Sequence, residues 1–142
     1  MIRHFTMDDY DKVYQLWKRT PGLGLRTMDD SKEGIERFLE RNPSTNFVAE
    51  EDGNIVGVVL GGHDGRRGYI YHACVDENYR RQSVGRELME RITEAMKDER
   101  ITRLGLVCLA ENNLGNEFWR RLGWVQRSDL NYYTISINEN NH

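Results

Sequence analysis

The sequence predicts a mixed α/β fold, in which helices cover both faces of a mixed sheet. Three observations support this class. Residues 47–75 contain three strand-like runs separated by turn signals, residues 84–96 repeat apolar side chains at helical spacing, and residues 104–109 form another apolar run. A strand–helix–strand unit of this length normally makes a right-handed crossover, so residues 104–109 should run parallel to residues 69–75.

The first 46 residues are expected to form a short strand and two helices. Thr6 and Asp9 make a capping box at the start of the first helix, which Thr20-Pro21 should end. Ser31 can cap the second helix, which should end before Asn42-Pro43 because the residue preceding a proline avoids helical geometry. A loop of residues 21–30 therefore connects the two helices.

The remaining elements follow from turns and periodicity. Asp52-Gly53 predicts a tight hairpin, and a second turn at residues 61–68 extends it to a three-strand meander. The helix from Val84 should span about 13 residues. A last helix should end at Gly123, and the alternation of residues 132–137 is typical of a further strand.

Composition narrows the class of protein. A chain of 142 residues with 38% hydrophobic content corresponds to a single domain, residues 1–142. It has neither a membrane-length apolar run nor a secretory-type N-terminus, so we expect a cytoplasmic protein. With a net charge of -3, it is not a nucleic-acid binder by bulk charge. Cys74 and Cys108 lie inside apolar runs, which favours buried free thiols over a disulfide or a metal site.

The stretch NYRRQSVGRELMERI, residues 78–92, concentrates donors and positive charge where a helix should begin. Unpaired amides at a helix start, together with the helix dipole, favour an anion such as phosphate. A glycine there lets the backbone approach closely, and arginines add charge-assisted bonds. The alternative is an ordinary solvated helix start with surface arginines. The residues concerned are Arg80, Arg81, Gln82, Ser83, Val84, Gly85 and Arg86.

Two segments carry a family resemblance. VDENYRRQSVGREL, and ENNLGNEFWRRLGW about 30 residues later, resemble the two signature segments of the GNAT superfamily of acetyl-CoA dependent N-acetyltransferases. The first signature, [QR]-x-x-G-x-[GA], holds the cofactor pyrophosphate, and the second reads roughly N-x-x-A-x-x-[FL]-Y-x-x-x-G-[FY]. The resemblance implies acetyl-CoA as cosubstrate. It also implies a mostly antiparallel sheet of about seven strands with a splayed parallel pair.

The resemblance assigns cofactor contacts residue by residue. Arg80 takes the [QR] position and Gly85 the final glycine, whereas Ser83 stands where the family has its first glycine. If that position needs positive φ, serine costs roughly 1 kcal/mol, which a hydroxyl–phosphate bond could offset. The splayed strand would offer the backbone of Ala73 and Val75 to the pantetheine arm.

The second signature adds Asn112 and Trp119. Asn112 matches the first asparagine, although it is also suited to capping a helix. Trp119 replaces a tyrosine thought to protonate the leaving thiolate. Because a thiol has a pKa of about 8.5, a thiolate can leave with little help, so activity should survive. Trp119 would then pack against the pantetheine or donate its N–H, or serve as a core aromatic beside Phe118.

The chemistry also needs a deprotonated amine and a polarised carbonyl. The N–H of Ala73 is a candidate oxyanion donor. Strand alternation places Tyr69 and Tyr71 on the face of Ala73, and these tyrosines and Glu50 are candidates for the proton path. His72 and Cys74 should point to the opposite face, which favours a structural His72 and argues against an acetyl-cysteine route.

The residues that select the acceptor amine are expected in the loop of residues 21–30 and at Tyr132-Tyr133. Asp29 and Asp30 could attract a cationic amine. The alternative is that they only stabilise the dipole of the helix that follows. The sequence thus predicts transfer of acetyl to a small-molecule or peptide amine by direct attack in a ternary complex. A non-catalytic acyl-CoA sensor is the alternative, and an RNA-binding module is weaker. No membrane partner is expected, and the acceptor and a homodimer are left open.

Overall fold

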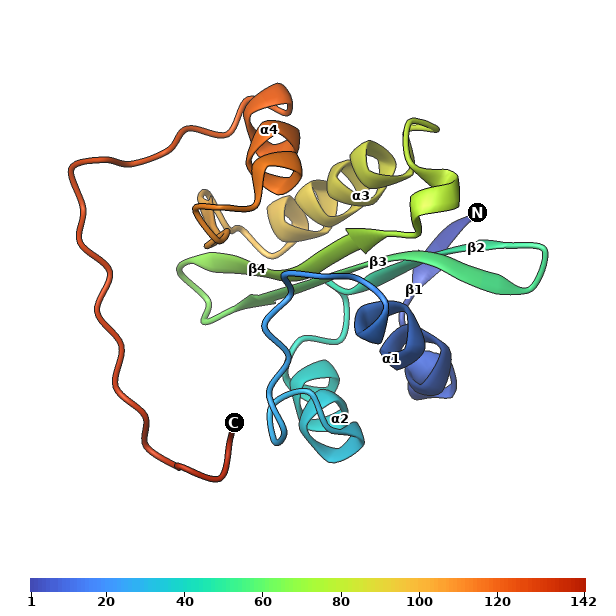
Figure 1. Ribbon diagram of the computed structural model, residues 1–142, viewed down its shortest axis with the longest axis horizontal. Coiled ribbons are helices and arrows are strands. Elements are labelled where there is room, and N and C mark those ends of the chain that lie inside the picture. Colours follow the sequence, from blue (N-terminus) through green and yellow to red (C-terminus); the bar gives the residue numbers. More distant parts are fainter.

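A computed structural model describes residues 1–142, and a five-stranded sheet forms its centre (Figure 1). The strand order is β1-β2-β3-β4-β5. The first four strands pair antiparallel, and β4 pairs with β5 in parallel, as the sequence predicted. The strands are β1 Ile2–His4, β2 Phe47–Glu51, β3 Asn54–His63, β4 Gly68–Val75 and β5 Leu104–Gly105.

Helices cover both faces of this sheet, which confirms the predicted class. Helices α1 (Tyr10–Lys18) and α2 (Lys32–Arg41) lie on one face, and α3 (Val84–Asp98) and α4 (Asn113–Arg121) lie on the other (Figure 1). Helix α3 has 15 residues, two more than expected, and makes the crossover from β4 to β5. Short 3-10 turns span Met7–Asp9 and Glu77–Tyr79.

The local signals in the sequence act as expected. The amide of Thr6 donates to the Asp9 carboxylate over 3.0 Å, and the hydroxyl of Ser31 accepts the amide of Gly34 over 3.0 Å. Asp52 and Gly53 both have positive φ, at 52° and 79°, as a tight hairpin turn requires. Local interactions alone therefore determine where α1 and α2 begin and where β2 ends.

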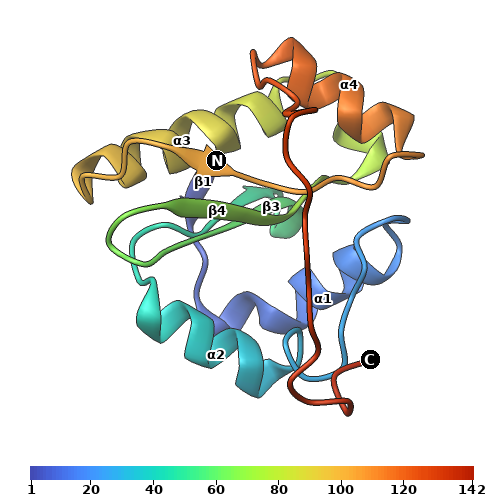
Figure 2. The same ribbon diagram turned by 90° about the vertical axis from the view of Figure 1, so that its left-hand side faces the viewer.

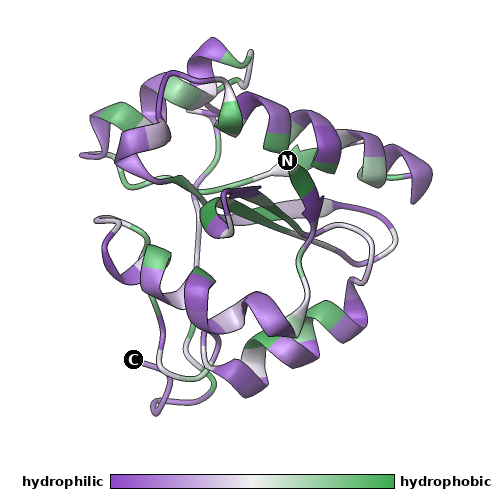
Figure 3. Ribbon diagram, turned by 90° about the vertical axis from the view of Figure 1, so that its right-hand side faces the viewer, coloured by the Kyte–Doolittle hydropathy of each residue, from purple (hydrophilic) through white to green (hydrophobic).

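The two faces of the sheet carry separate apolar clusters. Leu16, Trp17 and Ile35 pack on the α1/α2 face, whereas Leu88 and Ile92 of α3 pack on the other. Each such side chain is almost fully buried and contributes about 1.5–3 kcal/mol to stability. Figure 3 shows the strands between the helices as the most hydrophobic part of the fold, with polar residues along the outer helix surfaces.

The expected count of about seven strands is wrong, because the chain beyond Gly105 adds no strand. Pairing of β4 with β5 ends after two residues, and residues 124–142 contain no strand. The tail runs from α4 past the sheet toward the loop before α2 (Figure 2). Ile135 and Ile137 are 88% and 98% exposed. Alternation alone cannot make a strand without a partner edge, and β5 is too short to provide one.

The end of the tail is instead bonded to the loop before α2. The amide of Thr27 donates to the carbonyl of His142 over 2.8 Å, and the side-chain oxygen of Asn141 accepts the amides of Met28 and Asp29 over 3.0 Å. These bonds place the C-terminus beside the loop that the sequence singled out for acceptor choice. No helix in the structure has the length and apolar character needed to cross a membrane.

Candidate active site

The start of α3 presents a set of main-chain amides without protein partners. Ser83 adopts φ 66° and Arg81 φ 69°, and the Ser83 side chain does not cap the helix. The first amide of this turn with a protein acceptor belongs to Glu87, which donates to the Ser83 carbonyl over 2.9 Å. The N–H groups of residues 82–86 are therefore free to bind an anion, with the helix dipole favouring negative charge. Serine occupies the positive-φ position, at a cost of about 1 kcal/mol.

Arg80 and Gly85 fit against the end of β4. The Nε of Arg80 donates to the carbonyl of Val75 over 3.2 Å, so the guanidinium lies beside that strand end. A Cβ on Gly85 would come within 2.9 Å of the Phe118 ring and 3.6 Å of the Val75 side chain. Gly85 thus allows α4 to approach α3 closely. This packing role was not predictable from the sequence, because Phe118 lies 33 positions away.

The β4 strand has a free edge where the cofactor arm is expected. Its parallel pairing with β5 is limited to Gly68 with Leu104 and Tyr69 with Gly105. Residues 70–75 continue beyond this pairing as part of β4 but have no paired strand on that side. The predicted splayed parallel pair is confirmed. Ala73 and Val75 lie on this free edge and pack with the α3-side cluster.

A bulge in β4 reverses the expected facing of its side chains. Val58 pairs with Cys74 and Leu60 with Tyr71, so two residues, His72 and Ala73, lie opposite one residue of β3. His72 has φ 46°. After the bulge, Ala73 packs on the α3 side, whereas the ring of Tyr71 contacts Phe38 of α2 at 5.8 Å.

The prediction that Tyr69 and Tyr71 share a face with Ala73 is therefore wrong. Their ring centroids lie 4.6 Å apart with the planes tilted by 45°, on the face that α1 and α2 cover. Strict alternation fails because the bulge inserts one residue, and no glycine in this part of the sequence signals it. His72 and Cys74 do share a face, as predicted, and it is the same α1/α2 face.

The two tyrosines keep their protons at neutral pH. Burial, and then Tyr132 and Asp29, raise the pKa of Tyr71. Burial and the neighbouring Tyr132 also raise the pKa of Tyr69. A phenol with a raised pKa donates a hydrogen bond but is a poor base. The tyrosines therefore suit acceptor positioning better than proton removal.

Glu50 lies far from Tyr69. Its partner in the sheet is Ile55, whereas Tyr69 pairs with Gly62, seven residues further along β3. At about 3.3 Å per residue, this separation is roughly 23 Å. The Glu50 carboxylate instead accepts the Nε of Arg3 over 3.0 Å, and Arg3 also binds Asp9 at the start of α1 over 2.8 Å. The structure thus gives Glu50 a structural ion pair.

His72 has a partner that sequence reasoning missed. Its Nε2 lies 2.8 Å from Oδ1 of Asp30, and its ring meets the edge of Trp17 at 5.1 Å. Asp30 also accepts the amide of Arg26 over 2.7 Å. The 42-residue separation of Asp30 and His72 leaves no local signal of this contact. Only the packing of α1 and the following loop against β4 brings them together.

The cysteines are free, but only one is buried. Burial raises the pKa of Cys74 to about 12, so its thiol stays protonated and is a poor nucleophile. This argues against an acetyl-cysteine intermediate. Cys108 is only partly buried, because residues 106–109 do not form the expected central strand.

Asn112 and Trp119 occupy packing and capping positions. Oδ1 of Asn112 accepts the amide of Gly115 over 2.9 Å, so the alternative role as a helix cap is observed. The Trp119 ring lies between Phe118, at 4.9 Å, and Trp124, at 5.0 Å. Both arrangements leave the proposed contacts with the cofactor as predictions.

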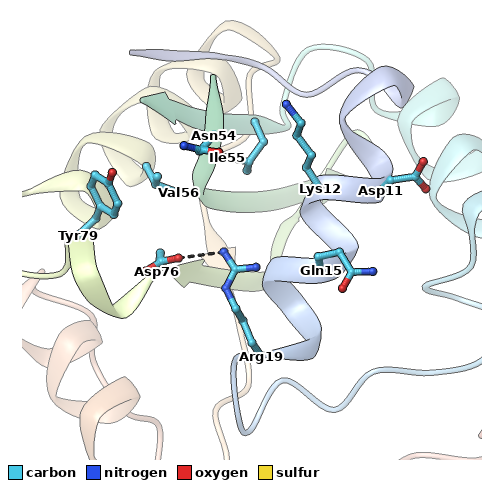
Figure 4. Close-up of a pocket in the computed structure, with 9 residues that line it drawn as sticks. All are labelled: Asp11, Lys12, Gln15, Arg19, Asn54, Ile55, Val56, Asp76 and Tyr79. Carbon is cyan, nitrogen blue, oxygen red and sulfur yellow. Dashed lines mark hydrogen bonds and ion pairs between the residues drawn. The ribbon is translucent and has the colours of Figure 1, made fainter. Parts of the chain in front are cut away.

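A polar depression of about 390 Å³ lies next to this region, between α1, the start of β3 and the turn at Tyr79 (Figure 4). Arg19 spans it to bind Asp76 over 2.9 Å. Its walls contain none of the predicted cofactor residues. The candidate site is therefore defined by the amides of α3 and the free edge of β4 rather than by this hollow.

Comparison with known proteins identifies the family. Residues 10–124 match the model of the Acetyltransferase (GNAT) family. An acetyltransferase of Sodalis glossinidius is 31% identical over 129 residues, which cover 91% of this chain and 89% of the relative. The chain belongs to the GNAT acetyltransferase family. The predictions of this family, of an acyltransferase and of acetyl-CoA as cosubstrate are confirmed.

Solved structures share the fold at lower identity. Ard1 from Thermoplasma volcanium superposes with a TM-score of 0.77 at 23% identity, covering 88% of this chain and 82% of that one. The PaiA N-acetyltransferase from Thermoplasma acidophilum, solved in complex with coenzyme A, gives 0.73 at 17% identity, with coverage of 86% and 87%. Both likenesses support the architecture described above.

Proposed function

We propose that this acetyltransferase transfers the acetyl group of acetyl-CoA to a primary amine, by direct attack of the amine in a ternary complex. The observation that carries the proposal is the set of unpaired amides of residues 82–86, next to the free edge of β4. Diphosphate would bind these amides, and the pantetheine arm would lie along Ala73 and Val75. Arg80, Arg81 and Arg86 add positive charge at this end of the site.

The acceptor would approach from the opposite face of β4. Tyr71 is 44% exposed there, beside Phe38 and the loop that carries Asp29. The carboxylate of Asp30 is already engaged by His72 and the amide of Arg26, so Asp29 is the acid left to attract a cationic amine. Asp29 keeps one hydrogen bond, from the side-chain amide of Asn141 over 2.8 Å. This surface favours an acceptor that carries positive charge.

The reaction needs a neutral amine and a stabilised oxyanion. An alkyl amine with a pKa near 10.4 arrives mostly as ammonium and must lose a proton before it attacks the thioester carbonyl. The N–H of Ala73, on the free edge, is the donor proposed for the developing oxyanion. The thiolate leaves without an acid, since its pKa is about 8.5, so Trp119 in place of tyrosine is compatible with turnover.

Release of free thiol from acetyl-CoA, measured over a panel of small amines, polyamines, aminoglycosides and peptides, tests this proposal. We expect amine-dependent thiol release and an acetylated product by mass spectrometry. Coenzyme A binding without turnover on any amine would favour an acyl-CoA sensor instead. Absence of coenzyme A binding would contradict the cofactor site itself.

A further inference from the structure

We propose that His72, oriented by Asp30, is the general base that removes the proton from the acceptor amine. This inference rests on the proposed amine acetylation. The sequence favoured a structural role because His72 was expected to point away from Ala73. In the structure His72 lies at the bulge, on the α1/α2 face. This is the face from which the acceptor is proposed to approach, so the orientation of His72 is compatible with a catalytic role.

The Asp30 contact fixes the proton arrangement of the ring. Asp30 is 5% exposed, and its Oδ1 lies 2.8 Å from Nε2 of His72. A carboxylate accepts only, so Nε2 carries the hydrogen and Nδ1 keeps its lone pair in the neutral ring. Nδ1 has no hydrogen-bond partner in the protein and is not among the fully enclosed atoms without one, and the His72 side chain as a whole is 13% exposed. A lone pair without a protein partner, on a ring held by a carboxylate, is the arrangement of an oriented base.

Asp30 is itself held in place. Its Oδ2 accepts the amide of Arg26 over 2.7 Å, and its carbonyl accepts the hydroxyl of Tyr10 over 2.6 Å. The edge of Trp17 contacts the other side of the His72 ring at 5.1 Å. These contacts leave the imidazole one orientation, so little freedom is lost when an acceptor binds.

The backbone at His72 stores strain next to the proposed oxyanion donor. A φ of 46° is costly for a histidine, and such conformations persist where the surrounding structure enforces them, often at active sites. Ala73 is the second residue of the same bulge and lies beyond the end of the β4–β5 pairing. The proposed base, His72, and the proposed oxyanion donor, Ala73, are therefore the two adjacent residues of the bulge in β4.

The groups around the ring favour the charged product of proton removal. Besides Asp30, the titratable or charged groups on the segments packed about His72 include Asp29, Tyr10, Tyr14, Tyr71 and Cys74, together with Arg26 before α2 and Arg19 and Arg80, which act on Cys74. Tyr10, Tyr71 and Cys74 have raised pKa values because of burial and stay neutral. Asp30 thus supplies the negative charge in direct contact with the imidazolium that forms.

The acceptor ammonium loses two protons in the course of the reaction. The ammonium gives one proton to Nδ1 of His72, directly or through a water, and the amine nitrogen attacks the thioester carbon. The carbon–sulfur bond breaks as the oxyanion collapses, and its electron pair leaves on sulfur. The second proton lost by the nitrogen goes to the thiolate, which gives amide and free thiol. The imidazolium returns its proton to solvent.

The pH dependence of kcat/KM for His72→Asn and Asp30→Asn tests the inference. Asparagine tolerates positive φ better than most residues, so His72→Asn keeps the bulge while it removes the base. We expect kcat/KM to fall at least about 100-fold in His72→Asn, within the range that general bases contribute. The acidic limb of the profile should disappear, whereas the Kd for coenzyme A stays within about twofold. Asp30→Asn should reduce the rate less and move that limb.

Cys74→Ala is the matched control, because Cys74 lies on the same face two residues away and has no proposed role. It should keep the wild-type rate and pH profile. A His72→Asn protein that keeps the wild-type kcat/KM and acidic limb would overturn the inference and leave the proposed function intact. If His72→Asn does not fold, Asp30→Asn provides the test. An unchanged pH profile of kcat/KM in an Asp30→Asn protein that still binds coenzyme A would equally overturn the inference. A wild-type protein inactive on every amine would instead contradict the proposed function.

Discussion

The two faces of β4 differ in what they offer a substrate. On the α3 face, the candidate cofactor site consists mainly of main chain, namely the free amides of residues 82–86 and the unpaired edge of β4. On the α1/α2 face, the site consists of side chains, with Tyr71, His72 and Asp30 in contact with one another or with the helices. Binding on one face therefore depends on backbone shape. Proton chemistry on the other depends on tertiary contacts.

Among the variants that test this difference, Gly85→Leu should have the largest effect on coenzyme A affinity. The leucine side chain fills the space where backbone and diphosphate are expected to meet. We expect coenzyme A to bind at least about 100-fold more weakly, equivalent to about 2.7 kcal/mol, as measured by calorimetry. Since a side chain at this position also meets Phe118, the melting temperature must be measured alongside.

A double variant separates the two roles of Gly85. Gly85→Ala is measured alone and together with Phe118→Leu, which relieves the contact of the new Cβ with the ring tip, within 2.9 Å. Restored stability without restored affinity would assign the loss to the cofactor site. Full recovery of affinity would show that Gly85 serves α3–α4 packing alone.

Trp119→Tyr restores the tyrosine found at this position in the family resemblance. We expect a loss of about 1–2 kcal/mol in unfolding free energy, because the indole packs against Phe118 and Trp124. The kcat should change by less than about fivefold, since the thiolate leaves without an acid. An increase of tenfold or more would show that the missing hydroxyl limits the rate.

Ser83→Gly relieves a positive φ at the start of α3. The relief of about 1 kcal/mol is partly offset by the greater freedom of glycine in the unfolded chain, so we expect a net gain of about 0.5 kcal/mol in urea unfolding. If the hydroxyl binds phosphate, coenzyme A affinity should fall by about fivefold. Unchanged affinity for coenzyme A would mean that the Ser83 hydroxyl does not bind the phosphate.

Glu50→Gln should have the smallest effect, because the Glu50 carboxylate is engaged by Arg3 and lies well away from Tyr69. Its partly exposed pair with Arg3 is worth less than about 1 kcal/mol. The acetylation rate should stay within about twofold of the wild type. A loss of tenfold or more would restore Glu50 to the proton path and show that its pair with Arg3 is not its only role.

The sequence predicted features that depend on neighbouring residues. Caps at Thr6 and Ser31, the Asp52-Gly53 turn and the helix start at Val84 all lie within a few positions of the residues that cause them. The bulge at His72 was not predictable in this way, because it is set by pairing with β3 rather than by a local signal. One inserted residue was enough to reverse the expected faces of Tyr69 and Tyr71.

Two other features depended on distant parts of the chain. The contact of Asp30 with His72 forms only when the loop before α2 packs against β4. The alternation in residues 132–137 is a strand signal, but β5 ends at Gly105 and offers no edge for it to join. Pattern alone thus defined the cofactor motif better than the acceptor side, where the site is assembled from separate segments.

The most direct test of the account is a titration of ¹⁵N-labelled protein with coenzyme A, followed by amide chemical shifts, with pantetheine as the control that lacks diphosphate. We predict that coenzyme A produces its largest shifts at the amides of residues 82–86, and that pantetheine leaves them unchanged. Saturable binding of coenzyme A with no shift at these amides would contradict the claim that the start of α3 holds the diphosphate.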